Sequence, residues 1–64
     1  MPVRVLSLEE ELPAAGVDLP EGDDLVAAAV IAVATGATAV RSADAARARR
    51  AVHIAERIAA ARTS

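Results

Sequence analysis

The chain has 64 residues and a net charge of −2, and a chain of this length buries only about 60% of its unfolded surface. Apolar residues make up 55%, but 18 of them are Ala and none is Phe, Tyr or Trp, which excludes a large core. The absence of Cys excludes disulfides and cysteine metal sites. We therefore expect a partner surface, supplied by another subunit or by the rest of a domain; a marginal helical miniprotein is the alternative.

The composition predicts a cytoplasmic protein. No stretch reaches the ~20 apolar residues that a membrane span needs, and the first twelve residues carry acids where a signal peptide has its apolar region.

Charge divides between the two halves of the chain. Residues 1–32 hold seven acids and one Arg, a net of −6, and residues 33–64 hold six Arg and two acids, a net of +4. The seven residues counted as Lys or Arg are all Arg, so the sequence excludes any reaction that needs a lysine side chain.

Residues 1–22 are predicted to form a short N-terminal segment of strand, helix and loop. The alternation at residues 3–6 favours a strand. Ser7 and Glu10 have the spacing of a capping box, which predicts a short helix over Leu8–Leu12 that ends at Pro13. Residues 13–22 hold two Pro and two Gly and are typical of a loop.

Residues 23–64 are predicted to form a helix–glycine–strand–helix unit. Its first helix runs over Leu25–Thr35, capped by Asp23 or Asp24 and ended by a left-handed Gly36. This helix has almost no polar residue, so we expect it to be buried on most sides. One of its faces is marked by Val26, Val30 and Val33.

The second half of that unit is a strand followed by the last helix. Thr38–Arg41 is short and apolar and lies between two helices, which is typical of a buried strand in a parallel sheet. Ser42 or Asp44 is expected to cap a helix over Ala45–Ala61, with Thr63 and Ser64 as a frayed end. The apolar stripe of this helix comprises Ala48, Ala51, Val52, Ala55, Ile58 and Ala59. The fold class is therefore α/β, mostly helical by residue count, as in a piece of a barrel or doubly wound sheet.

Arg41 is the candidate site residue because it stands where this strand ends and the next helix begins. A guanidinium and the N-terminus of a helix together favour binding of an anion such as phosphate. Ser42 is a weaker candidate, since its hydroxyl either joins that site or caps the helix. The structural alternative is that Arg41 extends to the surface or pairs with Asp44, which is itself more typical of an N-cap than of a catalyst.

The other polar residues favour structural roles. His53 is the only histidine and has no Cys beside it, so we expect it to be solvated and not to bind metal. Five arginines gather near the C-terminus, but without an aromatic residue to stack on bases a solvated helix face is favoured over a nucleic-acid surface. These arginines are Arg47, Arg49, Arg50, Arg57 and Arg62.

Residues 22–60 resemble the C-terminal end of dihydropteroate synthase, the pterin-binding enzyme of folate synthesis. In that family a helix rich in Ala and Thr precedes Gly-Ala, a strand ending near V-R-V-H-D or V-R-T-H-D, and the final helix. Gly36-Ala37, Val40-Arg41, Asp44 and Ala51 match this pattern. The resemblance implies the seventh helix, eighth strand and eighth helix of a (β/α)8 TIM barrel. Residues 4–12 resemble the family's R-K-S-F stretch more loosely, with Leu6 in place of Lys.

The resemblance also implies a ligand. The family's strand-end Arg helps to bind the phosphates of pterin pyrophosphate, a role that falls on Arg41, and the parent enzyme commonly uses Mg²⁺ with this substrate. The family's His two residues later falls on Ala43, and its active-site Lys has no counterpart in this chain.

We therefore interpret the chain as a fragment or degenerate homologue of dihydropteroate synthase, a transferase, with a phosphate-binding Arg, no complete active site and no catalysis by the isolated chain. Barrel strands encoded upstream would support a fragment. The alternative is a small interaction protein that forms a homodimer through its apolar helix. A nucleic-acid-binding regulator using the arginines is the weaker third reading.

Overall fold

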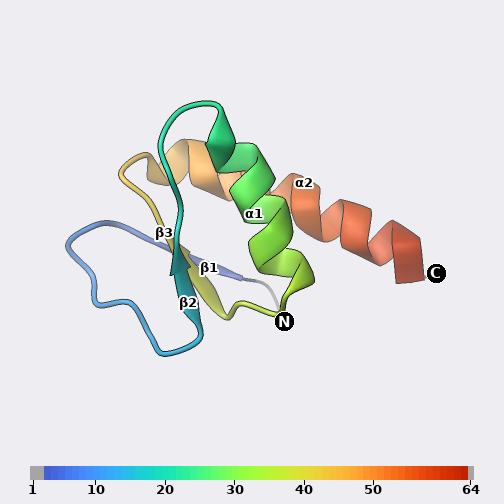
Figure 1. Ribbon diagram of the computed structural model, residues 1–64, viewed down its shortest axis with the longest axis horizontal. Helices are drawn as coiled ribbons and strands as arrows, with labels where there is room; N and C mark the ends of the chain where they lie inside the picture. Colours follow the sequence, from blue (N-terminus) through green and yellow to red (C-terminus); the bar gives the residue numbers. More distant parts are fainter. Residues whose placement is uncertain (1–2, 64) are drawn as a thin grey trace.

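The computed structural model describes residues 3–63 as three short parallel strands and two helices. In chain order these are β1 (Arg4–Leu6), β2 (Gly16–Asp18), α1 (Asp24–Ala34), β3 (Ala39–Arg41) and α2 (Ala45–Thr63) (Figure 1). The prediction of a small α/β unit with a parallel sheet is confirmed. Neither helix in this part of the chain is long and apolar enough to cross a membrane.

The strands lie in the order β1-β3-β2, so the strand that comes last in the chain lies in the middle of the sheet. Val40 of β3 is paired with Val5 of β1 on one side and with Val17 of β2 on the other. The predicted strands at 3–6 and 38–41 are confirmed, each one residue shorter at its start. Both predicted segments, 1–22 and 23–64, contribute strands to this one sheet.

Two predictions for residues 8–22 are wrong. Residues 8–12 form no helix, because the Ser7 N–H donates to the Glu10 carboxylate at 2.7 Å and the Glu10 N–H donates to the Ser7 carbonyl at 3.1 Å, which closes a tight turn. The predicted loop at 13–22 contains β2. This strand forms because β3 offers it a partner edge, and the flanking bonds run from Thr38 N to Ala15 O and from Leu19 N to Arg41 O.

Helix α1 begins and ends close to the predicted residues. Asp23 is at the N-cap position, but its side chain makes no capping hydrogen bond. At the other end Gly36 has φ +85, and its N–H donates to Val33 O while the Ala37 N–H donates to Ala32 O. These two bonds form a Schellman motif, so the predicted glycine stop is confirmed.

The buried side of α1 differs from the predicted one. Leu25, Ala29 and Ala32 face the core, whereas Val26 is 41% exposed and Ile31 is 63% exposed. The prediction of a helix buried on most sides is therefore wrong for this chain. The sequence pattern gave the wrong prediction because the helix carries large apolar residues on all of its sides, whereas the sheet and α2 cover only one side.

Helix α2 is capped as expected, since the Arg47 N–H donates to Asp44 Oδ1 at 3.0 Å. The helix continues to Thr63, two residues beyond the predicted end; Ser64 lies outside the described residues. Four residues of the predicted stripe are buried, and their small side chains let α1 and α2 pack closely, whereas Ile58 is 46% exposed. The four are Ala48, Ala51, Val52 and Ala55.

The sheet has a helix-covered face and a loop-covered face (Figure 1). Val40 is fully buried in the cluster that both helices share with the sheet. Because side chains alternate along a strand, Ala39 and Arg41 point to the opposite face. There the loop of residues 7–15 folds back, and Leu12 lies so close to Gly16 that a Cβ on that glycine would meet Leu12 Cδ1 at 2.6 Å.

Candidate anion site at the end of β3

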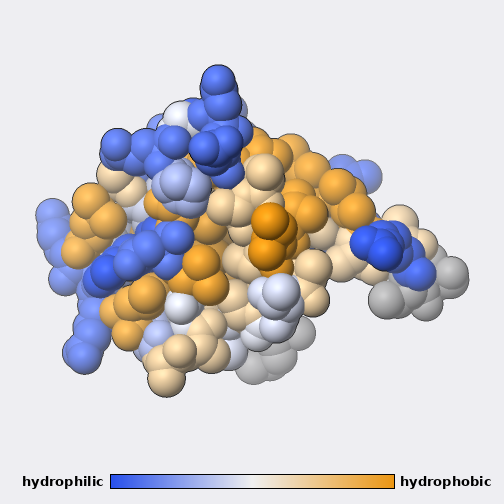
Figure 2. All heavy atoms as spheres, viewed as in Figure 1, coloured by the Kyte–Doolittle hydropathy of each residue, from blue (hydrophilic) through white to orange (hydrophobic). Residues whose placement is uncertain are grey.

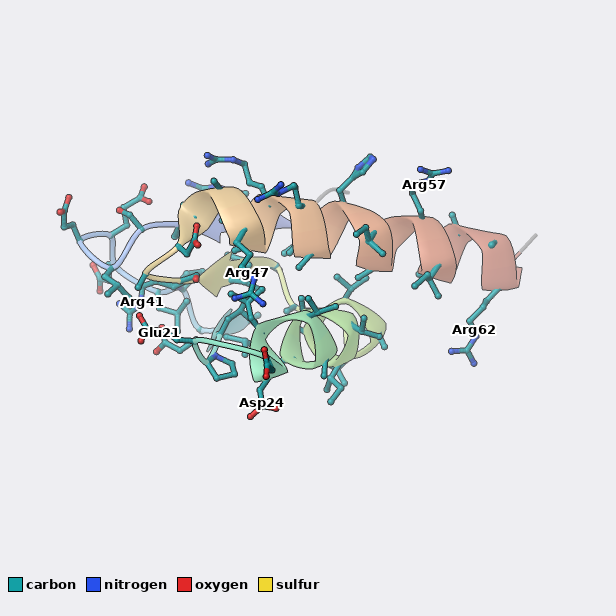
Figure 3. The ribbon with its side chains drawn as sticks, turned by 90° about the horizontal axis from the view of Figure 1, so that it is seen from above. Glu21, Asp24, Arg41, Arg47, Arg57 and Arg62 are labelled. Carbon is teal, nitrogen blue, oxygen red and sulfur yellow. The ribbon has the colours of Figure 1, made fainter. Side chains whose placement is uncertain are left out.

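Arg41 is the last residue of the central strand and lies on the face away from both helices (Figure 3). Its neighbour Val40 points into the core, so strand alternation fixes the direction of the Arg41 side chain. The carboxyl end of a parallel strand is where α/β proteins commonly place ligands. Arg41 therefore lies at the end of a parallel strand, as the sequence predicts.

The guanidinium of Arg41 is held by β2 and by the loop before it. Its Nε donates to Asp18 Oδ1 at 2.7 Å and its Nη2 donates to Asp18 Oδ2 at 2.9 Å, which makes a bidentate pair. Its Nη1 donates to the Glu10 carbonyl oxygen at 3.1 Å. Asp18 is the register partner of Arg41 on the neighbouring strand, so the pair follows from the alignment of β2 with β3. The ion-pair partner is thus Asp18, and not Asp44, which the sequence offers as an alternative partner.

The pair changes the titration of both groups. The hydrogen bonds from Arg41 lower the pKa of the Asp18 carboxyl below its usual value, and the positive charge of Arg41 acts in the same direction. The hydrogen bonds to Asp18 raise the pKa of Arg41. The Arg41 side chain is 26% exposed and that of Asp18 is 54% exposed. Both groups therefore remain charged at neutral pH and both can be reached by solvent.

Ser42 belongs to the helix cap. Ser42 is 1% exposed. Its hydroxyl accepts a hydrogen bond from the Asp44 N–H at 3.1 Å and donates one to the Asp44 carbonyl oxygen at 3.4 Å. Its own N–H donates to Leu6 O, which fixes the chain as it leaves β3. The structure therefore places the Ser42 hydroxyl inside the turn before α2, and Arg41 is the side chain exposed to an incoming anion.

The remaining candidates lie along α2. His53 is exposed, and within residues 3–63 no group of three or more His, Asp or Glu side chains is placed to hold a metal ion. Figure 3 shows the labelled arginines Arg47, Arg57 and Arg62 spread along α2 and pointing in different directions.

Asp18 and the Glu10 carbonyl are the site groups that sequence reasoning missed. Asp18 ends β2, which the sequence pattern predicts as loop, and the signal that could have identified it is an acidic residue at a strand end opposite Arg41. An open hollow of about 550 Å³ lies on the same face of the sheet. It is lined by Arg4, Leu6, Glu10, Glu11, Leu12, Pro13 and Ala14.

Comparison with protein-family models, with curated proteins and with solved structures finds no match to this chain. A function therefore has to be inferred from Arg41 and its neighbours.

Proposed function

We propose that this chain is a non-catalytic relative of the last repeat of dihydropteroate synthase, and that Arg41 binds the phosphates of a pterin pyrophosphate. The observation that carries the proposal is the place of Arg41, at the carboxyl end of the central parallel strand and on the face away from the helices. In a (β/α)8 barrel the helices lie outside, so that face points to the interior, and ligands bind at the carboxyl ends of the strands.

The connection between β2 and β3 supports this assignment. The two strands are parallel neighbours, and α1 alone lies between them in the chain, as the helix between consecutive barrel strands does. The β1 segment also holds residues that loosely resemble the family's R-K-S-F stretch. β1 occupies the other edge of β3, where a complete barrel would continue with its first strand.

In this proposal Asp18 competes with the phosphate for the N–H donors of Arg41. Its two oxygens, 2.7 and 2.9 Å from Arg41 Nε and Nη2, occupy the fork that would bind two phosphate oxygens. A guanidinium has five N–H donors, and three of those of Arg41 are engaged. An anion must therefore displace Asp18 or bind weakly at the remaining two donors.

The proposal excludes catalysis by this chain on its own. One anion ligand does not make a reaction site, and leaving-group stabilisation requires several preorganised donors. The family's strand-end His is replaced by Ala43 and its Lys has no counterpart. Binding without turnover is the expected behaviour.

The test is titration calorimetry with inorganic pyrophosphate on the whole chain. We expect weak binding by the native protein, and affinity at least tenfold higher for Asp18→Asn, because the amide removes the competing negative charge. Adding Arg41→Gln to Asp18→Asn should abolish the gain.

The matched control is Arg49→Gln in the Asp18→Asn background, which removes one exposed arginine from α2 and should leave the affinity unchanged. Equal binding by Asp18→Asn and by the Asp18→Asn, Arg41→Gln double variant would overturn the proposal. Far-UV circular dichroism checks that each variant retains its helices.

A further inference from the structure

The two helices expose large aliphatic side chains that no other residue within 3–63 covers fully. Ile31 is 63% exposed, Ile54 51%, Ile58 46% and Val26 41%. Among the described residues, the buried Leu, Ile and Val side chains number only five: Leu6, Leu19, Leu25, Val40 and Val52. Single exposed apolar residues are ordinary, but here the helices expose almost as many large aliphatic groups as the core contains. We call Val26, Ile31, Ile54 and Ile58 the apolar helix face.

The surface over the two helices is apolar at its centre and charged at its ends. Figure 2 shows apolar side chains gathered over α1 and α2, between hydrophilic groups at either end of the view. In Figure 3 the acids Glu21 and Asp24 lie at the start of α1, and Arg62 lies at the far end of α2. A hollow beside this surface is lined by Ile54, Arg57, Ile58 and Ala61. An apolar centre with charge at its edge is the usual anatomy of a protein interface.

We propose that the apolar helix face binds a second copy of this chain about a twofold axis. The charge distribution selects this partner. A twofold axis that lies in the plane of the face, perpendicular to the line joining its two ends, brings the acidic start of α1 in one copy against the basic end of α2 in the other, and does so twice. A standard interface takes about 800 Å² from each partner, which is roughly a fifth of the 4359 Å² total accessible surface of this chain.

This proposal is independent of the anion site. The apolar helix face lies on the helices, whereas Arg41 and Asp18 lie on the opposite face of the sheet. Either proposal can fail while the other holds, since pyrophosphate binding and association are measured separately.

The first test is sedimentation velocity over a range of protein concentrations. The native chain should be a dimer, and Ile31→Asp should shift it to monomer because a carboxylate would be buried in the interface. Leu8→Asp is the matched control, since Leu8 is 60% exposed but lies in the loop after β1, away from the apolar helix face. A native chain that stays monomeric at millimolar concentration would overturn the proposal, as would equal dissociation by the two variants.

The second test swaps the charges at the two ends of the face. Asp24→Arg alone and Arg62→Glu alone should each weaken the dimer at least tenfold, because each places like charges together across the axis. Mixed in equal amounts, the two variants should form a heterodimer with near-native affinity, since each altered charge then meets its complement. Circular dichroism of each single variant checks folding. Failure of the mixture to associate, with both variants folded, would contradict the twofold arrangement.

Discussion

The side chains of Asp18 and Arg41 show how a strand register can set the state of a site. They lie opposite each other on β2 and β3, and their bidentate contact orients the guanidinium toward β2. Exposed ion pairs contribute little to folding stability. The main consequence of the pair is therefore on ligand binding, because it fills the donors that an anion needs.

The pH dependence of stability should report this pair. Because the pKa of Asp18 is lowered in the folded chain, its contribution to stability is complete above the unfolded value of about 3.9. It is lost as pH falls through the lower, folded pKa. The difference in unfolding free energy between the native chain and Asp18→Asn should therefore be constant from pH 5 to 7 and shrink below about pH 4. Urea denaturation at each pH measures it; a difference that grows on acidification would contradict the pair.

Arg41 could be identified from the sequence because a charged residue at the end of an apolar strand is a local signal. Its partner could not, because Asp18 lies 23 residues away and the contact depends on the parallel register of two strands that α1 separates in the chain. The Glu10 carbonyl carries no sequence signal at all, since every residue has one.

At the scale of the elements, the two helices were the most predictable. Asp44, Gly36 and the small-residue stripe of α2 are local signals that act within one helix, and each has the expected role. β2 was missed because only three residues, Gly16–Asp18, form it and its partner edge comes later in the chain. The buried side of α1 was misjudged because Leu25, Ala29 and Ala32 form its buried centre, while Val33 packs only at the edge of the core and Val26 is exposed.

The end of α1 should be sensitive to Gly36. Its φ of +85 is costly for a residue with a side chain, so Gly36→Ala should destabilise the fold by about 1 kcal/mol. Gly36→Asn should cost less, because Asn tolerates the left-handed region. Urea denaturation of the three proteins gives the order; equal stability of Gly36→Ala and the native chain would show that α1 ends differently.

The central rung of the sheet offers a matched test of burial. Val40 is 0% exposed and Val17, paired with it, is 37% exposed. Val40→Ala should cost about 2 kcal/mol or more, from lost burial and a cavity, whereas Val17→Ala should cost less than half as much. Thermal or urea unfolding measures both. Equal losses would place the core elsewhere than between β3 and the helices.

At the scale of the whole molecule, the chain is thin, with extents of 36 × 25 × 15 Å. One small sheet with two helices on one side leaves the outer side of those helices exposed. The composition predicted this shortage of core, since so many of its apolar residues are Ala. A second copy on the apolar helix face would extend the buried region and leave the Arg41 face open to a ligand.

The central claim is that Arg41 is an anion site whose donors are occupied by Asp18. The most direct measurement is the NMR signal of the Arg41 Nε–H group during a titration with inorganic pyrophosphate, in the native chain and in Asp18→Asn. The account predicts a small, non-saturating shift in the native chain and a large, saturating shift in Asp18→Asn. An Arg41 signal that does not respond in Asp18→Asn, while the fold is intact, would contradict it.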